Sequence, residues 1–175
     1  MNYRIRKLVW AGVFLALGIV VPSIFHLTFG AIAGKIFLPM PFVVLLASLV
    51  LGPFYGLILG CITPLISSSI TGMPAFAILP FMTFELASYG FLAGFFQNTL
   101  RINTLISLTL SMVLGRVLLG LFVSLVGHQL GLTVGAVSYV LTAFTTGFPG
   151  ILLQVILIPL IVNRLKAANY LKFNQ

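Results

Sequence analysis

The sequence contains almost no negative charge, since Glu85 is its only acidic residue. Charged residues of both signs make up 6% of the chain, whereas soluble domains carry about 25%. The mean hydropathy is +1.24, and apolar runs recur from Leu8 to about residue 163. A helix needs about 20 mostly apolar residues to cross a bilayer. We therefore expect an all-α integral membrane protein, located in the cell membrane.

Cysteine and the common catalytic motifs are also scarce. The single cysteine, Cys61, lies inside an apolar run and cannot form an internal disulfide. The sequence contains no GxxxxGK[ST], no HExxH and no Ser-His-acid constellation. One carboxylate and two histidines argue against an intramembrane hydrolase or a metal enzyme. We therefore predict no enzymatic activity, no metal site and no cofactor in this chain.

Glycine, proline and polar clusters divide the chain into six expected transmembrane segments within one domain, residues 1–175. Residues 28–39 are predicted to form a loop. Residues 128–147 are predicted to form a long, less regular connection that can contain a short helix. Pro74 is interpreted as the first residue of the fourth span. The expected spans are Leu8–His26, Pro39–Leu51, Tyr55–Ile70, Pro74–Phe96, Thr104–Gly127 and Pro149–Val162.

The positive charge follows this topology. Of the nine Lys and Arg residues, Lys35 falls in an outer loop and Arg116 within a span. Short basic segments stay on the cytoplasmic side of a membrane, so both termini are predicted to be cytoplasmic. The net charge of +8 is therefore interpreted as a topology signal, and no nucleic-acid partner is expected. The seven cations on the predicted cytoplasmic side are Arg4, Arg6, Lys7, Arg101, Arg164, Lys166 and Lys172.

Two ionisable residues, Glu85 and Arg116, fall inside expected spans. Such residues cost about 2.5 to 3.5 kcal/mol at a helix centre, and they often mark functional sites. Glu85 is 11 residues after Pro74, and Arg116 is 11 residues before Gly127, so each lies about 16 Å below the outer end. The matching depths predict an ion pair near mid-membrane. Either the pair only fixes helix packing, or one member also contacts a polar ligand.

Polar and aromatic residues are concentrated toward the outer ends of the spans, and we predict a substrate pocket there. Each residue has a structural alternative: hydroxyls bond back to their own helix, histidines are solvated, aromatic rings pack against lipid, and Tyr89 serves internal packing. Together with Arg116, the helix N-termini on this side suit an anionic group. The candidate substrate-binding residues are Arg116, Glu85, His26, Ser68, Thr71, Phe81, Tyr89, Ser124, His128 and Gln129.

Small residues in the first span form a separate signal. Gly12 and Ala16 are four residues apart, and Ala11 lies beside them. This spacing lets another backbone approach closely, either inside the bundle or from a partner protein.

Several stretches resemble the substrate-binding (S) subunits of energy-coupling-factor (ECF) vitamin transporters, and similarity is closest to the branch that includes pantothenate and folate binders. The stretches are LPMPFVVLLASLVLGPFYGLILGCITPLISS, TGMP, FELASYG, GRVLLG and FPGILLQVILIP, within residues 38–159.

The resemblance implies a transporter subunit that captures a vitamin from outside and releases it inside. Its implied partners are the transmembrane coupling subunit and two cytoplasmic ATPases, which use ATP. Ala11, Gly12 and Ala16 occupy the place of the family's AxxxA-like coupling contact, with glycine as a departure from that pattern. A carboxylate facing Arg116 would favour pantothenate among small substrates, with cobalamin, folate or another vitamin as alternatives. A non-transporting membrane scaffold, with a charge pair that only locks its helices, is the alternative from another class.

Overall fold

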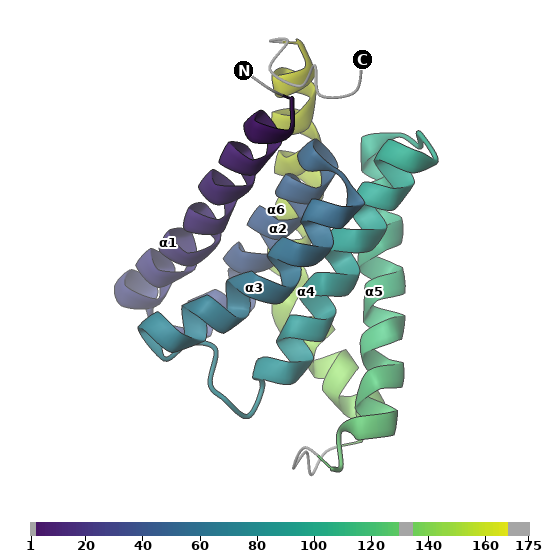
Figure 1. The fold of residues 1–175 in the computed structure, drawn as a ribbon. Helices are drawn as coiled ribbons and strands as arrows, with labels where there is room; N and C mark the ends of the chain where they lie inside the picture. The colour runs from purple at the N-terminus through teal and green to yellow at the C-terminus, as the bar shows by residue number, and fades with distance from the viewer. Residues whose placement is uncertain (1–2, 130–134, 168–175) are drawn as a thin grey trace.

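The structure is a computed structural model, and it describes residues 3–129 and 135–167. These residues form a bundle of helices without a strand. The first turn of α1 and the last turn of α6 lie at the same end of the bundle (Figure 1). A π-helical turn, η1, continues α4. The elements are α1 (Tyr3–Phe37), α2 (Pro39–Leu51), α3 (Pro53–Thr71), α4 (Leu79–Gly94), η1 (Phe95–Thr99), α5 (Thr104–Val126) and α6 (Ala136–Ala167).

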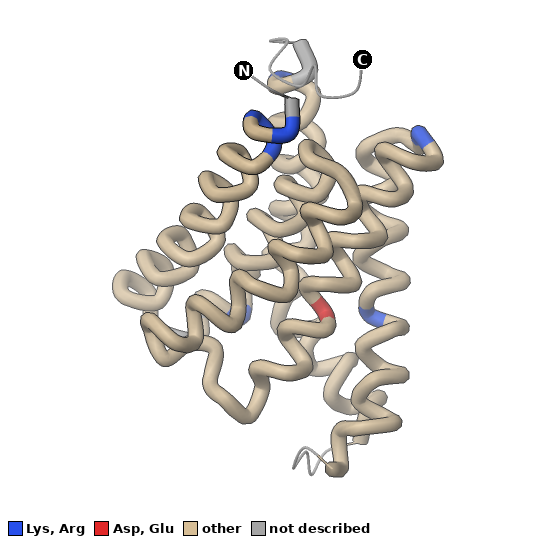
Figure 2. The backbone as a smooth tube through the Cα atoms, viewed as in Figure 1, with Lys and Arg blue, Asp and Glu red and all other residues tan. Residues whose placement is uncertain are grey.

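Six helical segments of the described chain are long and apolar enough to cross a membrane. The all-α class and the expected number of six membrane-crossing helices are therefore confirmed, although the bounds of several helices differ from the prediction. Most of the Lys and Arg positions gather at the end of the bundle near the chain termini (Figure 2). The helix α2 is buried at almost every position and forms the centre of the bundle. An apolar helix without a polar face is expected to be buried in this way.

The predicted loop at residues 28–39 is wrong, because most of it is helical. The helix α1 extends to Phe37, with a break in its backbone at Gly30. The φ angle of Gly30 is 77°, a left-handed value that glycine adopts without a Cβ clash. The residues after the break include Ile36 and alanines, and alanine is a strong helix former. The second part of α1 therefore leads back to α2 instead of forming an open loop.

Glycines bring α3 and α4 into close backbone contact. A Cβ atom added to Gly56 would lie 2.2 Å from the carbonyl oxygen of Gly90, and one added to Gly94 would lie 2.5 Å from the nitrogen of Pro53. Only residues without a side chain permit such an approach. Gly90 and Gly94 therefore serve internal packing.

The helix α4 begins at Leu79, five residues later than predicted from Pro74. The connection before it is held by side chains at the end of α3. The Ser68 hydroxyl donates a hydrogen bond to the Pro74 carbonyl at 2.9 Å, and the Thr71 hydroxyl donates to the Met73 carbonyl at 3.2 Å. Pro74 therefore belongs to the connection, and Pro80 is the proline in the first turn of α4.

The helix α6 is much longer than the predicted span from Pro149 to Val162. It begins at Ala136 and includes much of the predicted soft connection, while residues 130–134 lie outside the described chain. Gly150 brings α6 against the C-terminal end of α1, since a Cβ atom there would lie 2.6 Å from the carbonyl oxygen of Ile36. This contact places the middle of α6 beside the beginning of α2.

Candidate functional site

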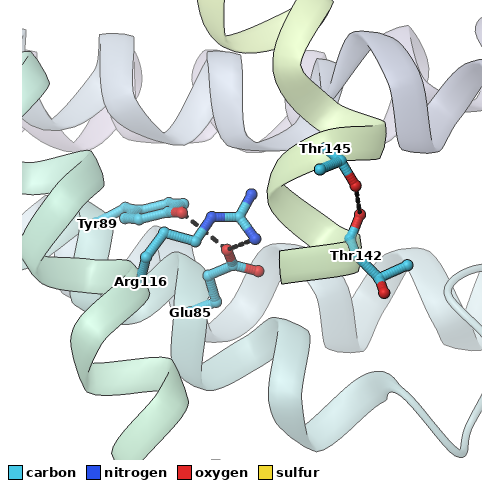
Figure 3. A network of polar contacts seen from close by, with 5 residues as sticks. All are labelled: Glu85, Tyr89, Arg116, Thr142 and Thr145. Carbon is cyan, nitrogen blue, oxygen red and sulfur yellow. Dashed lines mark hydrogen bonds and ion pairs between the residues drawn. The ribbon is translucent and has the colours of Figure 1, made fainter. Parts of the chain in front are cut away.

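The predicted ion pair between α4 and α5 is confirmed. Nη1 of Arg116 lies 3.1 Å from Oε1 of Glu85, and the hydroxyl of Tyr89 donates a hydrogen bond to the same oxygen at 2.8 Å (Figure 3). The side chains of Arg116 and Glu85 are only 12% and 15% exposed. The Glu85 carboxylate thus faces a positive charge and accepts a hydrogen bond, and the two interactions together offset part of its desolvation cost.

The local sequence explains how these groups meet. Tyr89 follows Glu85 by four residues, so both side chains lie on the same face of α4. Gly115 precedes Arg116 on α5, and a Cβ atom at Gly115 would lie only 2.3 Å from Cδ1 of Tyr89. The glycine therefore provides the space for the tyrosine ring next to the arginine.

A cavity of about 600 Å³ lies between α5 and α6. Its α5 wall runs from Thr109 to Ser124, and its α6 wall runs from Ala136 to Val155. Tyr89 of α4 and residues at the beginning of α2 complete the lining. Most of the lining is apolar and much of it is exposed, so the cavity is open. Cavities of about 300 to 1,000 Å³ with a few polar groups are typical of small-molecule sites.

The hydroxyl groups that border the cavity already have partners. The Ser124 hydroxyl donates to the carbonyl of Gly120 at 2.7 Å, and the Thr109 hydroxyl donates to the carbonyl of Leu105 at 3.1 Å. These bonds lie within α5, as expected for serine and threonine in a helix. The hydroxyls are therefore weaker candidates for ligand recognition than the groups described next.

Two polar side chains on the cavity walls retain unused hydrogen-bonding capacity. Among the described residues, Nε and Nη1 of Arg116 have no hydrogen-bond acceptor, because the contact with Glu85 is an ion pair without hydrogen-bond geometry. Oε1 of Gln154 on α6 likewise has no donor within the described chain. The residues that line the cavity therefore include an arginine with unused donors on one helix and a glutamine with an unused acceptor on the other.

The structure brings four of the predicted site residues to this region, with Arg116, Tyr89 and Ser124 on the cavity wall and Glu85 paired to Arg116. Phe81 is fully buried behind it, with its ring centroid 5.7 Å from that of Tyr139. None of the remaining predicted residues lines the cavity.

Those remaining residues lie elsewhere in the bundle. His26 packs against Gly34 in the returning part of α1. Ser68 and Thr71 hold the connection before α4 through the hydrogen bonds given above. His128 and Gln129 are exposed in the turn after α5. The predicted single pocket containing all ten residues is therefore not found around this cavity.

Gln154 is a polar residue of the cavity wall that sequence reasoning missed. Its Nε2 donates a hydrogen bond to the carbonyl of Leu38 at 3.1 Å, across the contact between α6 and the beginning of α2. A signal was present, because Gln154 is the only polar side chain in the apolar stretch FPGILLQVILIP. An amide is not ionisable, and only the packing of α6 reveals that it is buried beside a cavity.

The small residues of α1 divide into an outer and an inner group. Gly12 and Ala16 are exposed, and apart from the neighbouring backbone of α1 no described atom lies within 4 Å of a Cβ atom added to Gly12. Ala11 is half-buried against the apolar core. Gly18 faces the bundle, since a Cβ atom there would lie 2.7 Å from Cγ2 of Thr63. The Gly12 and Ala16 positions therefore leave a shallow, open surface on the outside of α1.

Six apolar helices, with a ligand-sized cavity between α5 and α6 and a buried charge pair beside it, define a multi-pass membrane protein with a candidate small-molecule site. A family model described as "ECF transporter, substrate-specific component" matches residues 6–162, and the chain belongs to this family. No curated protein and no solved structure matches the chain. Family membership makes the chain a substrate-capturing transporter subunit that works with an ECF transporter module.

Proposed function

We propose that residues 1–175 form a single six-helix unit that captures a vitamin outside the cell, and that this vitamin is pantothenate. The observation that carries the proposal is the position of Arg116 on the wall of a ligand-sized cavity in a chain of this family. Pantothenate carries one carboxylate, which suits the guanidinium of Arg116. Its branched apolar part suits the valine-rich walls on α5 and α6.

The size of the cavity favours pantothenate over the larger vitamins. A volume of about 600 Å³ lies in the range that encloses drug-sized ligands. Biotin and folate also carry carboxylates, so they are included in the test below. Cobalamin is a much larger molecule, and most of it would project beyond the walls of this cavity.

The energy for transport would come from partner proteins. We propose that both termini are cytoplasmic and that Ala11, Gly12 and Ala16 contact the transmembrane coupling subunit. Two cytoplasmic ATPases would then hydrolyse ATP and drive release of the vitamin inside. The open surface at Gly12 and Ala16 supports this contact, because small residues allow a second helix to approach closely.

Vitamin binding by the purified chain tests the proposal. The full chain is purified in detergent without its partners, and isothermal titration calorimetry is carried out with pantothenate, biotin, folate, thiamine, riboflavin and cobalamin. Native mass spectrometry of the same preparation identifies any copurified small molecule. We expect tight, one-to-one binding of pantothenate. Tight binding of another vitamin would replace pantothenate as the substrate, and no binding of any of the six would contradict vitamin capture.

A further inference from the structure

Gln154 has an unusual environment for a residue in the middle of a transmembrane helix. Its side chain is fully buried, yet the residue borders the cavity between α5 and α6. Its nitrogen Nε2 is used, since it donates to the Leu38 carbonyl at 3.1 Å. Its oxygen Oε1 has no donor among the described residues.

Chemistry determines which end of the amide is free. The Leu38 carbonyl can only accept a hydrogen bond, so the NH₂ group of Gln154 must face it. Oε1 is therefore held on the other side of the amide. A buried carbonyl without a donor is unfavourable, because it has lost its hydrogen bonds to water. A donor that reaches Oε1 would remove this cost.

The hydroxyl groups around the cavity donate to other groups, which leaves Oε1 of Gln154 to a donor from a molecule in the cavity. The Ser124 and Thr109 hydroxyls on the α5 wall donate within their own helix. The Tyr89 hydroxyl donates to Glu85. The Arg116 guanidinium lies on the wall formed by α5 and α4, where Glu85 holds it (Figure 3).

We propose that Oε1 of Gln154 accepts a hydrogen bond from a hydroxyl or amide N–H group of the bound substrate, and that this bond determines specificity. The proposal rests on the proposed function and narrows its substrate class. The substrate carries an acidic or other acceptor group for Arg116 on α5, and a hydrogen-bond donor for Gln154 on α6. An acid that has no donor elsewhere in the molecule satisfies only one of the two walls.

The matched control is another glutamine of the same chain. Gln97 is also buried, its Nε2 donates to the Leu49 carbonyl at 3.0 Å, and its Oε1 has no donor among the described residues. Gln97 does not line the cavity. Replacing either glutamine with methionine removes one bond to a backbone carbonyl and one amide oxygen without a donor, but only Gln154 borders the cavity.

The test combines these variants with modified ligands. Wild type, Gln154→Met and Gln97→Met are titrated with the vitamin that binds wild type most tightly among pantothenate, biotin and folate. Each is also titrated with derivatives in which one donor at a time is methylated, either the amide N–H or a hydroxyl. We expect wild type and Gln97→Met to bind one derivative about tenfold more weakly than the parent vitamin. Gln154→Met should bind the parent and that derivative equally.

The outcomes separate a direct contact from a structural role. If Gln154 only braces the α1–α2 link, Gln154→Met weakens both ligands by the same factor and preserves their ratio, which would overturn the proposal. If Gln154→Met does not fold, Gln154→Glu keeps the shape and an acceptor oxygen. That variant should retain the preference for the parent vitamin, and loss of the preference would also overturn the proposal. If wild type binds none of the three acidic vitamins, pantothenate fails as the substrate and this proposal fails with it, while binding of thiamine, riboflavin or cobalamin would still support vitamin capture.

Discussion

Gly115 of α5 leaves the space that the ring of Tyr89 fills, and a Cβ atom at Gly115 would lie 2.3 Å from Cδ1 of that ring. The position of the ring determines where the Tyr89 hydroxyl donates, and it donates to Glu85 beside Arg116. A residue without a side chain thus contributes to the geometry of a charged site that α4 and α5 share.

The first prediction follows from this contact. Gly115→Ala should displace the Tyr89 ring, lengthen its bond to Glu85 and lower the free energy of unfolding by about 1 to 3 kcal/mol, the usual cost of overpacking. Thermal unfolding in detergent measures the change. Gly120→Ala on the same helix is the control, because its added Cβ atom would meet Val140 at an ordinary 3.5 Å. Equal unfolding temperatures for the two variants would show that the Tyr89 ring moves without cost.

The second prediction concerns the charge pair. Arg116→Met alone leaves the Glu85 carboxylate without its counter-ion, and removing one partner of a buried pair costs about 3 to 5 kcal/mol. We expect the lower part of this range, because both side chains remain slightly exposed. The double variant Glu85→Leu/Arg116→Met should recover much of the lost stability, since no charge remains unpaired. Thermal unfolding of the two single variants and the double variant gives the coupling between them.

The same double variant distinguishes a transporter subunit from a scaffold. If the pair only locks α4 against α5, the double variant should fold, assemble and support normal vitamin uptake in cells. If Arg116 binds substrate, uptake should be lost while assembly with the partner subunits persists. Uptake of radiolabelled vitamin, measured together with copurification of the partners, separates these results. We expect the loss of uptake.

The ion pair illustrates which parts of the structure the sequence can predict. Glu85 and Arg116 are the only ionisable residues deep within the expected spans, so charge balance alone suggests that they meet. The pairing is confirmed although α4 begins at Leu79 and not at Pro74, because depth counted along the chain only has to place the two side chains within reach. The bounds of Pro39–Leu51 were predicted correctly, since a proline begins that helix and Gly52 follows it.

Other features depend on packing that no local pattern contains. Pro149 was interpreted as a helix start, but it lies inside α6, where the C-terminal end of α1 packs against Gly150. Gln154 was missed because an amide has no charge to balance. Its importance arises only from its contact with Leu38 and from the adjacent cavity.

The third prediction tests whether Arg116 binds an acid. Converting the carboxylate of the bound vitamin to a primary amide should weaken binding to wild type by about 10- to 100-fold, because a charge-assisted hydrogen bond is replaced by a neutral contact. Arg116→Met should bind the acid weakly and no longer distinguish it from the amide. Calorimetric titrations of both proteins with both ligands supply the four affinities. Equal affinity of wild type for acid and amide would point to a neutral substrate.

The last prediction concerns the outer surface of α1. Gly12→Leu and Ala16→Leu should prevent assembly with the coupling subunit and ATPases, because their side chains fill a surface that a second helix would approach. Vitamin binding by the isolated chain should be unchanged, since an added Cβ at Gly12 meets no described atom within 4 Å other than the neighbouring backbone of α1. Gly18→Leu is the contrasting variant: it faces Thr63 and should destabilise the chain itself. Copurification of the partners, compared with calorimetry on each isolated variant, gives both readouts. Normal assembly of Gly12→Leu and Ala16→Leu would place the coupling contact elsewhere, because a leucine at the centre of a close helix crossing cannot be accommodated without separating the two backbones.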